Sequence, residues 1–390
     1  MTPSNRDRFL GVARFERPKD LYLGTFFHEF WRETLHAWIE QGAPPTLMDS
    51  RFRASYLGLD HTRMLREVVS GLVQVPVALG SKEAYYPIPP LVPQFDPQVL
   101  QEDAKTITMV NAGGQKTKLF RDDPQKMPLY LDYPVKDRDT WREYKKRLDP
   151  EAPGRYPAAW EHYVRRITQM DAAVCLMPGG FFGFLREWMG VEKLLYTFYD
   201  DPALIEEMMD QLLHLETAVV EKVTRDIRVD WVLFWEDMAY KSGSFISPEM
   251  FRRFMTPRYR KLADLIRSRG IDVLIVDSDG NVGELIPLFL ECGVNGHWPL
   301  EVASGMDAVA LRKNYGKDVI LAGNIDKRVF QKGKEAIREE VMAKVPFLLE
   351  RGGYFPSIDH LVPPDVTLES YVYFLNTMRE VAGLEPLSVP

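Results

Sequence analysis

Residues 231–280 read WVLFWEDMAYKSGSFISPEMFRRFMTPRYRKLADLIRSRGIDVLIVDSDG, and this stretch decides the fold class. The apolar runs 231–235 and 273–276 are rich in β-branched and aromatic residues, as buried parallel strands are. Between them, a Ser-Pro-Glu triplet beginning at Ser247 supplies a helix N-cap, a first-turn proline and an early acid, and Gly270 supplies a stop. The stretch therefore predicts a strand, a helix and a second strand, the repeating unit of a parallel α/β fold.

The same alternation extends over residues 171–390, where at least six strand–helix units fit. The other predicted strands are 172–177, 294–298, 319–322 and 354–358, and the predicted helices are 202–225, 248–270, 282–291, 306–315, 334–351 and 368–381. A (β/α)8 barrel typically takes about 250 residues and tolerates insertions, so a chain of 390 residues is long enough to form one. We find no clean domain boundary and expect one domain over residues 1–390, with 171–390 as its regular βα units.

Residues 1–170 are less regular, and we expect them to hold a cap and the first barrel units. A strand at 21–27 and an aromatic-rich helix at 30–39 are predicted, and six prolines crowd residues 76–97. Within 105–120, two short segments flank the turn-forming sequence Asn-Ala-Gly-Gly, which is a β-hairpin signal. The sequence therefore predicts an extended Pro- and aromatic-rich N-terminal cap with a β-hairpin insertion.

Composition limits the classes of partner and compartment. The chain has 49 Lys and Arg against 56 Asp and Glu, a formal net charge of −7, which disfavours a general role in nucleic-acid binding. No apolar run reaches the roughly 20 residues that span a membrane, and the charged N-terminus lacks the apolar core of a signal peptide. Cys175 and Cys292 are too few for a disulfide scaffold and fit a reducing compartment, so a cytoplasmic enzyme is expected.

Polar residues recur where the predicted strands end, in five consecutive units. In a parallel barrel, functional side chains sit at this edge. The residues are Glu236, Asp237, Asp277, Ser278, Asp279, Asn281, His297, Glu301, Asn324, Asp326, Asp359 and His360. Loops are polar in any protein, but acidic and histidine residues that directly follow apolar strands exceed what solvated turns require, so a functional site is predicted here.

This set of side chains fits three chemistries, and the residues alone leave all three open. Glu236, Asp277 and Asp279, converging with His360, could hold a metal ion, because oxygen-rich ligand sets suit hard or borderline cations. Asp359 or His360 could move protons as a catalytic acid or base. The aspartates could instead accept hydrogen bonds from cationic or pyrrolic N–H groups of a substrate.

Four further residues and one turn complete the candidate site. Asp237 is a further catalytic candidate, and Asn281, His297 and Asn324 are predicted to bind substrate. The glycine pair at 179–180 forms a strand-to-helix turn that could present backbone N–H groups to an anion. A tight turn without a ligand is the simpler interpretation of that pair.

Several motifs in the regular half carry a family resemblance. They are Trp-Glu-Asp-Met-Ala-Tyr-Lys-Ser-Gly at 235–243, Asp-Ser-Asp-Gly-Asn at 277–281, Gly-Asn-Ile-Asp at 323–326 and the stretch from Gly-Gly-Tyr to Asp-His at 352–360. Together they resemble uroporphyrinogen decarboxylase-type barrels, most strongly over about 230–376. The resemblance implies a (β/α)8 TIM barrel and two functional branches. One branch decarboxylates the acetate arms of uroporphyrinogen without a cofactor, and the other transfers methyl groups to or from corrinoid proteins or small thiols, often with zinc.

The chain departs from both branches at known signatures. The decarboxylase signature Arg-Gln-Ala-Gly-Arg-Tyr is only loosely echoed at 51–56, where Arg51 and Arg53 are candidates to bind a carboxylate substrate. The zinc-dependent thiol methylases use a His-x-Cys pair where this chain has Asp277 and Asp279. What remains is similar to methyltransferase relatives that demethylate small molecules for a corrinoid protein.

The resemblance therefore implies a methyltransferase of one-carbon metabolism. It would move a methyl group from a small donor, such as a methoxylated aromatic, to a corrinoid on a separate partner protein, with zinc as a candidate metal. His360 or Asp359 would protonate the leaving group. The alternative is a decarboxylase of uroporphyrinogen or another aromatic carboxylate that needs no cofactor. A homodimer is expected by resemblance.

Overall fold

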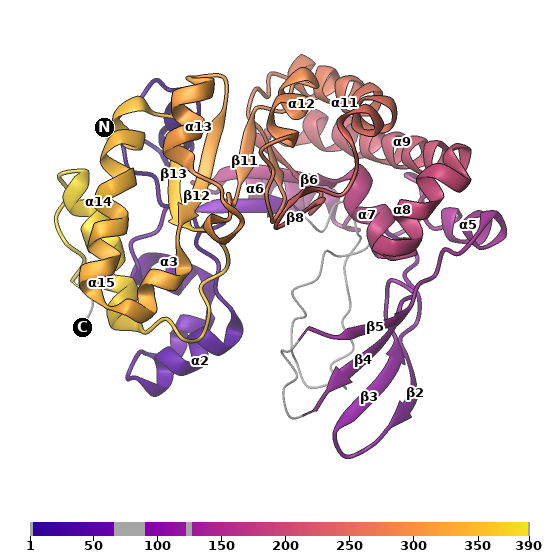
Figure 1. The fold of residues 1–390 in the computed structure, drawn as a ribbon, viewed down its shortest axis with the longest axis horizontal. Helices are drawn as coiled ribbons and strands as arrows, with labels where there is room; N and C mark the ends of the chain where they lie inside the picture. The colour runs from indigo at the N-terminus through magenta and orange to yellow at the C-terminus, as the bar shows by residue number, and fades with distance from the viewer. Residues whose placement is uncertain (1–2, 66–89, 122–126, 389–390) are drawn as a thin grey trace.

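The computed structural model describes residues 3–65, 90–121 and 127–388, and Figure 1 shows their arrangement. A curled parallel sheet is flanked by helices, and a separate antiparallel sheet projects from it. Among the described residues, no helix is both long enough and apolar enough to cross a membrane.

Seven parallel strands make up the main sheet. In spatial order they are β1 (Thr62–Leu65), β6 (Ala173–Gly179), β7 (Trp231–Trp235), β10 (Leu274–Asp277), β11 (Gly296–Trp298), β12 (Ile320–Ile325) and β13 (Tyr354–Ile358). The register places Ile275 beside Gly296. A parallel bridge between Gly24 and Asp60 adds one more segment beside β1, where the strand 21–27 was predicted. The order and direction of the strands confirm the predicted (β/α)8 barrel class.

Helices connect these strands on the outside of the sheet. They are α7 (Phe181–Met189), α8 (Val191–Asp200), α9 (Pro202–Asp226), α10 (Pro248–Met250), α11 (Thr256–Ser268), α12 (Leu285–Glu291), η4 (Val302–Ser304), α13 (Ala308–Tyr315), η5 (Lys327–Lys332), α14 (Lys334–Arg351) and α15 (Leu368–Val381). The helices predicted at 334–351 and 368–381 are confirmed with the same bounds. The helix predicted at 248–270 is interrupted by a π-helical turn, η3 (Phe251–Met255), just before Pro257, because proline has no N–H for an α-helical bond.

Helix α1 (Asn5–Ala13) closes the end of the barrel at which the strands begin. Phe9 reaches the barrel interior, where its ring lies 5.2 Å from that of Trp231. Arg6 pairs with Asp230, which immediately precedes β7. The amino-terminal end of the barrel is therefore sealed by apolar packing and an ion pair.

The aromatic residues of the predicted cap divide between two places. Phe26 and Phe27 fill the barrel interior. The predicted helix at 30–39 is α2 (Arg32–Glu40), and the indole N–H of its buried Trp38 donates to the carbonyl of Val366 at 2.8 Å. This part of the cap is thus packed against the region before α15. Of the proline-rich segment 76–97, only 90–97 lies within the described residues.

The predicted hairpin is confirmed and is part of a larger antiparallel sheet. Its strands, in order, are β2 (Gln98–Glu102), β3 (Thr106–Val110), β4 (Lys116–Phe120) and β5 (Leu129–Asp132). Residue Val110 pairs with Lys116 across the Asn-Ala-Gly-Gly turn. This sheet projects away from the barrel (Figure 1). Helices α5 (Arg138–Lys145) and α6 (Trp160–Thr168) then lead the chain back to the barrel.

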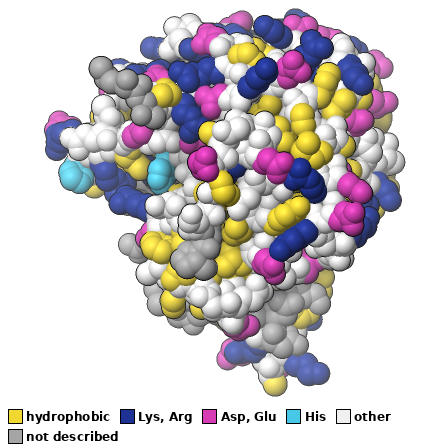
Figure 2. Space-filling view, turned by 90° about the vertical axis from the view of Figure 1, so that its left-hand side faces the viewer, with side chains coloured by type: hydrophobic (Ala, Val, Ile, Leu, Met, Phe, Trp, Pro, Cys, Tyr) yellow, Lys and Arg dark blue, Asp and Glu magenta, His cyan; other side chains and the backbone are white. Residues whose placement is uncertain are grey.

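The outer face shown in Figure 2 carries intermingled positive and negative side chains with scattered apolar areas. Ion pairs between helices account for part of this mixture. Lys334 of α14 lies 2.6 Å from Glu369, next to the start of α15, and Arg338 lies 2.7 Å from Glu380. Exposed pairs of this kind contribute little to stability, so this face is a solvated surface.

Candidate functional site

The carboxyl-terminal strand ends, called the mouth below, bring Asp279 and His360 together. Nε2 of His360 lies 3.6 Å from Oδ2 of Asp279, although 81 residues separate them in the chain. The His360 ring lies nearly parallel to the indole of Trp31, with an interplanar angle of 9° and centroids 6.4 Å apart. Both side chains are partly exposed, 29% for His360 and 43% for Asp279. An imidazole held by a carboxylate and an aromatic ring is suited to general acid–base work.

The charges around Asp279 keep it ionised. Burial by itself raises the pKa of Asp279, but the neighbouring His360, Lys327 and Arg186 outweigh burial and hold that pKa below its usual value. Asp279 is therefore an anion, and it lies next to the His360 imidazole at the mouth.

Arg186 and Asp237 form a second charged pair at the mouth. Nη1 of Arg186 lies 2.6 Å from Oδ2 of Asp237 and also donates to the Asp237 carbonyl at 2.7 Å. The guanidinium lies 5.2 Å from the ring centroid of Trp235. Asp237 has a φ of 45°, a strained value for a residue other than glycine, which the two bonds from Arg186 help to hold.

Lys327 and Glu301 form a third charged pair. Nζ of Lys327 lies 3.4 Å from Oε1 of Glu301, and Oε2 of Glu301 accepts from the Ser304 hydroxyl at 3.0 Å. The buried carboxylate of Asp359 accepts backbone N–H groups of Val302 at 2.8 Å and Lys327 at 3.1 Å. Burial raises the pKa of Asp359. Asp359 thus joins the loops after β11 and β12, and His360 is the residue of this dipeptide that reaches the charged pairs.

Glu236 is committed to the start of helix α7. Its two oxygens accept backbone N–H groups of Phe181, Phe182 and Gly183 at 2.7–2.8 Å, together with the Tyr259 hydroxyl. The donors belong to the first turn of α7, just after the glycine pair at 179–180, and the side chain that accepts their N–H groups is Glu236. Burial raises the pKa of Glu236 to about 7 against these donors. No acceptor position of Glu236 is left for a metal ion without breaking this cap.

A second buried carboxylate lies behind helix α7. Glu216 of α9 is fully buried, and within the described residues neither of its oxygens has a hydrogen-bond partner. Burial, and then the charge of Glu236, raises the pKa of Glu216 well above its usual value. The raised pKa favours the neutral form of Glu216 beside Glu236.

Of the predicted substrate-binding residues, His297 and Asn324 are buried in the framework, while Asn281 lies in the loop that carries Asp279. His297 is buried on the helix-facing side of β11, where its ring lies 5.7 Å from that of Phe289, because side chains alternate along a strand. Burial lowers the pKa of His297 to about 3. Asn324 is also buried, where it accepts from the Ala308 N–H and donates to two loop carbonyls. Asn281 accepts the N–H of Gly283 within its own turn.

The two arginines of the 51–56 segment lie on α3 (Ser50–Tyr56), which follows η1 (Pro45–Met48). Arg51 is exposed. Arg53 donates to the Leu47 carbonyl at 2.7 Å and lies over the Phe30 ring. The structure does not bring either guanidinium to the charged pairs of the mouth, since Arg53 is used to pack α3 against the preceding loop.

The three predicted metal ligands, Glu236, Asp277 and Asp279, do not form one donor set. Asp277 is half-buried at the end of β10, on the face opposite Glu236, since the register pairs it with Trp235. Over residues 3–65, 90–121 and 127–388, no three His, Cys, Asp or Glu side chains gather with metal-binding geometry. These residues do not fit the expected zinc ion, so no chemical step is derived through it.

The sequence did not single out Arg186 or Lys327, and it predicted Trp31 only as one of the aromatic residues of the cap. Arg186 lies inside an aromatic helix and Trp31 lies in the N-terminal half, so neither is at a predicted strand end. Lys327 directly follows the Gly-Asn-Ile-Asp motif. The neighbouring acidic residues are the signal that indicates Lys327, because a cluster of acids needs cations nearby.

The comparisons with known proteins agree with this architecture. The family model described as "Uroporphyrinogen decarboxylase (URO-D)" matches residues 130–381. The chain belongs to the uroporphyrinogen decarboxylase family.

Individual relatives are distant. The uroporphyrinogen decarboxylase of Legionella pneumophila (strain Paris) is 23% identical over 210 residues, 53% of this chain and 55% of that protein. The uroporphyrinogen decarboxylase of Alcanivorax borkumensis is 26% identical over 197 residues, 47% of this chain and 50% of that protein. The chain thus spans about half the length of the curated relatives it matches. A solved structure described as a methyltransferase from Methanosarcina mazei has a TM-score of 0.58 at 15% identity and covers 97% of this chain and 98% of its own, which shows a shared fold.

Proposed function

We propose that this chain is a methyltransferase of one-carbon metabolism. Its substrate is a small methyl donor such as a methoxylated aromatic, and its acceptor is a corrinoid carried by a separate protein. The observation that carries the proposal is the Asp279–His360 pair, an acid–base group held against Trp31 at the mouth of the barrel.

His360 supplies the proton that the departing oxygen of the donor requires. Nε2 of His360 faces Asp279, which leaves Nδ1 for the substrate. The carbon–oxygen bond of the donor breaks, the methyl group passes to the acceptor, and the oxygen takes the proton from the imidazole. The corrinoid, when bound, supplies the nucleophile. Asp279 stabilises the protonated imidazole before transfer, and Trp31 fixes the plane of the ring.

Arg186 and Lys327 at the mouth are each paired with a carboxylate of the chain, which favours methyl transfer over decarboxylation. A porphyrinogen carries several carboxylates, which unpaired Arg or Lys side chains would bind best. Arg186 and Lys327 already face Asp237 and Glu301, so a substrate carboxylate would have to displace a carboxylate of the chain. A smaller donor with an ether oxygen does not need that exchange. The decarboxylase alternative is supported by the names of the curated relatives.

The proposal is tested by following the visible spectrum of cobalt in a reduced corrinoid protein incubated with this protein and a panel of methoxylated aromatics. We expect methylcobalamin to form with at least one donor, and His360→Gln to slow its formation about 10²–10⁴-fold while leaving the thermal unfolding temperature unchanged. Carbon dioxide released from uroporphyrinogen, with no methylcobalamin from any donor, would instead establish the decarboxylase alternative.

A further inference from the structure

Asp279 lies in a short turn, residues 278–281, and the residue before it anchors the turn. Ser278 is 2% exposed, and its N–H donates to the Trp298 carbonyl at 3.1 Å. The hydroxyl of Ser278 accepts the Met238 N–H at 3.0 Å and donates to the carbonyl of Asp279 itself at 3.3 Å. Ser278 therefore ties the backbone of Asp279 to the end of β11 and to the segment after β7, while the Asp279 carboxylate stays 43% exposed.

The residue after Asp279 anchors the other side of the turn. Gly280 has a φ of 86°, and a Cβ atom on it would lie 2.7 Å from the carbonyl oxygen of Ala239 in the short strand β8 (Ala239–Tyr240). Because a side chain fits neither this conformation nor this space, only glycine lets the turn approach β8 so closely. Asn281 continues the contact, since its N–H donates to the carbonyl of Tyr240 at 2.9 Å.

The segment that carries His360 is fixed to the same turn. The buried carboxylate of the residue before it, Asp359, accepts the Val302 N–H at 2.8 Å. Glu301, the neighbour of Val302, accepts the Gly280 N–H at 3.3 Å. The turn and the His360 segment are thus joined through the loop after β11, and these contacts set the distance of 3.6 Å between the imidazole and its carboxylate partner.

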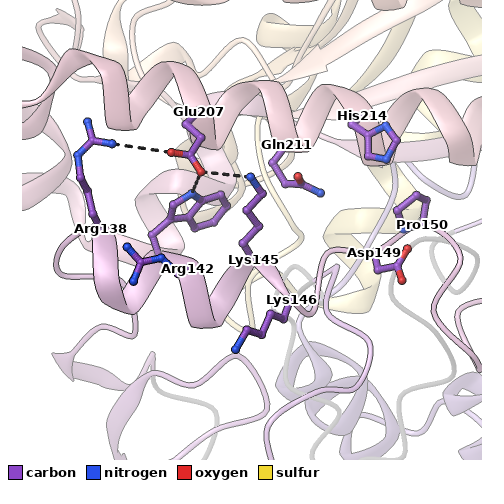
Figure 3. Close-up of a pocket in the computed structure, with 10 residues that line it drawn as sticks. Arg138, Arg142, Lys145, Lys146, Asp149, Pro150, Glu207, Gln211 and His214 are labelled. Atoms are coloured by element: carbon purple, nitrogen blue, oxygen red, sulfur yellow. Dashed lines mark hydrogen bonds and ion pairs between the residues drawn. The ribbon is translucent and has the colours of Figure 1, made fainter.

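The surface groove between α5 and α9, drawn in Figure 3, has no comparable buried frame. Its four Lys and Arg side chains each pair with a carboxylate of the chain, in the pairs Arg138–Asp201, Arg142–Asp139, Lys145–Glu207 and Lys146–Glu143. These side chains are between 32% and 84% exposed. The charges of the groove are therefore balanced within the chain and screened by solvent, unlike the buried contacts around Asp279.

We infer that Ser278 and Gly280 are positioning residues, which place the Asp279 carboxylate against the His360 imidazole. Ser278 is buried and Gly280 has no side chain, so both act through Asp279. Their catalytic importance rests on the proposed function, because the pair that they hold is the acid–base group of that reaction. The geometry of the pair can be measured without any substrate.

The test compares Gly280→Ala with Gly283→Ala, which makes the same change three residues further along the chain. Gly283 has no positive φ, and a Cβ atom on it would lie 3.2 Å from the end of the Asn281 side chain, which can move. The readout is the ¹H–¹⁵N NMR spectrum of the His360 imidazole in the full chain, with Asp279→Asn as the reference for a lost carboxylate. We expect Gly280→Ala to shift the His360 resonances as Asp279→Asn does, and Gly283→Ala to leave them in place.

Ser278→Ala is the second variant and does not depend on the outcome for Gly280→Ala. It removes the hydroxyl that joins the Met238 N–H to the Asp279 carbonyl, and it adds no atoms to the crowded turn, so it should fold even if Gly280→Ala does not. We expect a smaller shift of the His360 resonances in the same direction. If Gly280→Ala does not fold, the spectrum of Ser278→Ala decides.

Two results would overturn the inference. One is that the His360 resonances keep their wild-type positions in the folded variants, even if these unfold at lower temperature, because Ser278 and Gly280 would then serve stability alone. The other is an equal shift in Gly280→Ala and Gly283→Ala. Shifted resonances in Gly280→Ala, with no methylcobalamin formed by the unmodified chain from any donor, would contradict the proposed function and leave the positioning role intact.

Discussion

The two ends of the barrel use the same residue types in opposite ways. At the closed end, the side chain of Asp230 is 1% exposed, accepts the Val174 N–H at 2.9 Å and pairs with Arg6. At the mouth, the Asp279 side chain is 43% exposed and lies 3.6 Å from His360, and the charges of Lys327 and Arg186 also act on it. A carboxylate whose oxygens are taken by backbone N–H groups is part of the framework. A half-exposed carboxylate paired with another side chain is able to exchange that partner for a substrate.

The same contrast separates the neighbours Glu236 and Asp237. Glu236 is fully buried and caps α7, whereas Asp237 is 27% exposed and pairs with Arg186. These two residues therefore hold helix α7 at two points. Glu236 accepts the backbone N–H groups of its first turn, and Asp237 pairs with Arg186, which the helix carries to the mouth. Position at a strand end alone does not distinguish the two roles.

The largest effect in the comparison of the two ends is expected for His360→Gln, which should reduce turnover without reducing stability. Loss of a positioned acid typically lowers turnover about 10²–10⁴-fold. Because His360 is partly exposed, the free energy of unfolding should change by less than about 0.5 kcal/mol. Turnover is measured as methylcobalamin formation, and the free energy of unfolding is measured by urea unfolding. A variant that loses stability and activity together would place His360 with the framework residues.

The next effect concerns Glu236 and should be seen in stability. Glu236→Ala leaves three buried N–H groups and the Tyr259 hydroxyl without an acceptor, which should lower the free energy of unfolding by about 3 kcal/mol. The control Asp237→Asn should cost less than about 1 kcal/mol, since its pair is partly exposed. Equal losses in urea unfolding would remove the distinction drawn between these neighbours.

A smaller effect should appear on acidification through His297. Because burial lowers its pKa to about 3, the folded state binds fewer protons than the unfolded state below pH 6.5, so stability falls as pH drops through that range. At pH 5 this loss is about 2 kcal/mol for one histidine. His297→Leu should remove it, giving a flatter dependence of unfolding free energy on pH between 6.5 and 4. An unchanged pH dependence would show that His297 is not held neutral.

The smallest effect belongs to the closed end. Arg6→Gln removes the nearer of two ion-pair partners of the buried Asp230, which keeps its bond from Val174 and the longer pair with Arg228, and should cost about 1–2 kcal/mol. Arg14→Gln breaks the more exposed pair with Asp272 and should cost less than about 1 kcal/mol. Neither variant should alter turnover. A change in turnover with Arg6→Gln would mean that the closed end communicates with the reaction.

The barrel was predictable because its signals are local. Strands 231–235 and 354–358 and helices 334–351 and 368–381 were predicted with their observed bounds, since apolar periodicity and caps lie within each segment. Helix α1 was missed as the closing element because its role depends on contacts with Asp230 and Trp231, more than 200 residues away. No local pattern carries that information.

The sequence predicted which residues gather at the candidate site but not the role of each one. Asp279, His360 and Asp237 take part in the charged pairs, while Glu236, Asp359 and Asn324 serve the backbone of neighbouring loops and helices. Which of these roles a residue takes depends on whether its side chain meets a backbone N–H or another side chain, and that follows from three-dimensional register. The orientation of His297 could have been predicted from the sequence. Side chains alternate along β11, so His297 and Trp298 point to opposite faces of the sheet.

The most direct test of the account is to find where a methyl donor binds. The chain has seven histidines, so two-dimensional ¹H–¹⁵N NMR of histidine side chains, assigned with His360→Gln, reports on the mouth and the framework at once. We predict that titration with 2-methoxyphenol shifts the His360 resonances in a saturable way and leaves the buried His28 and His297 unmoved. Saturable shifts at other histidines with none at His360 would contradict a functional site at the mouth.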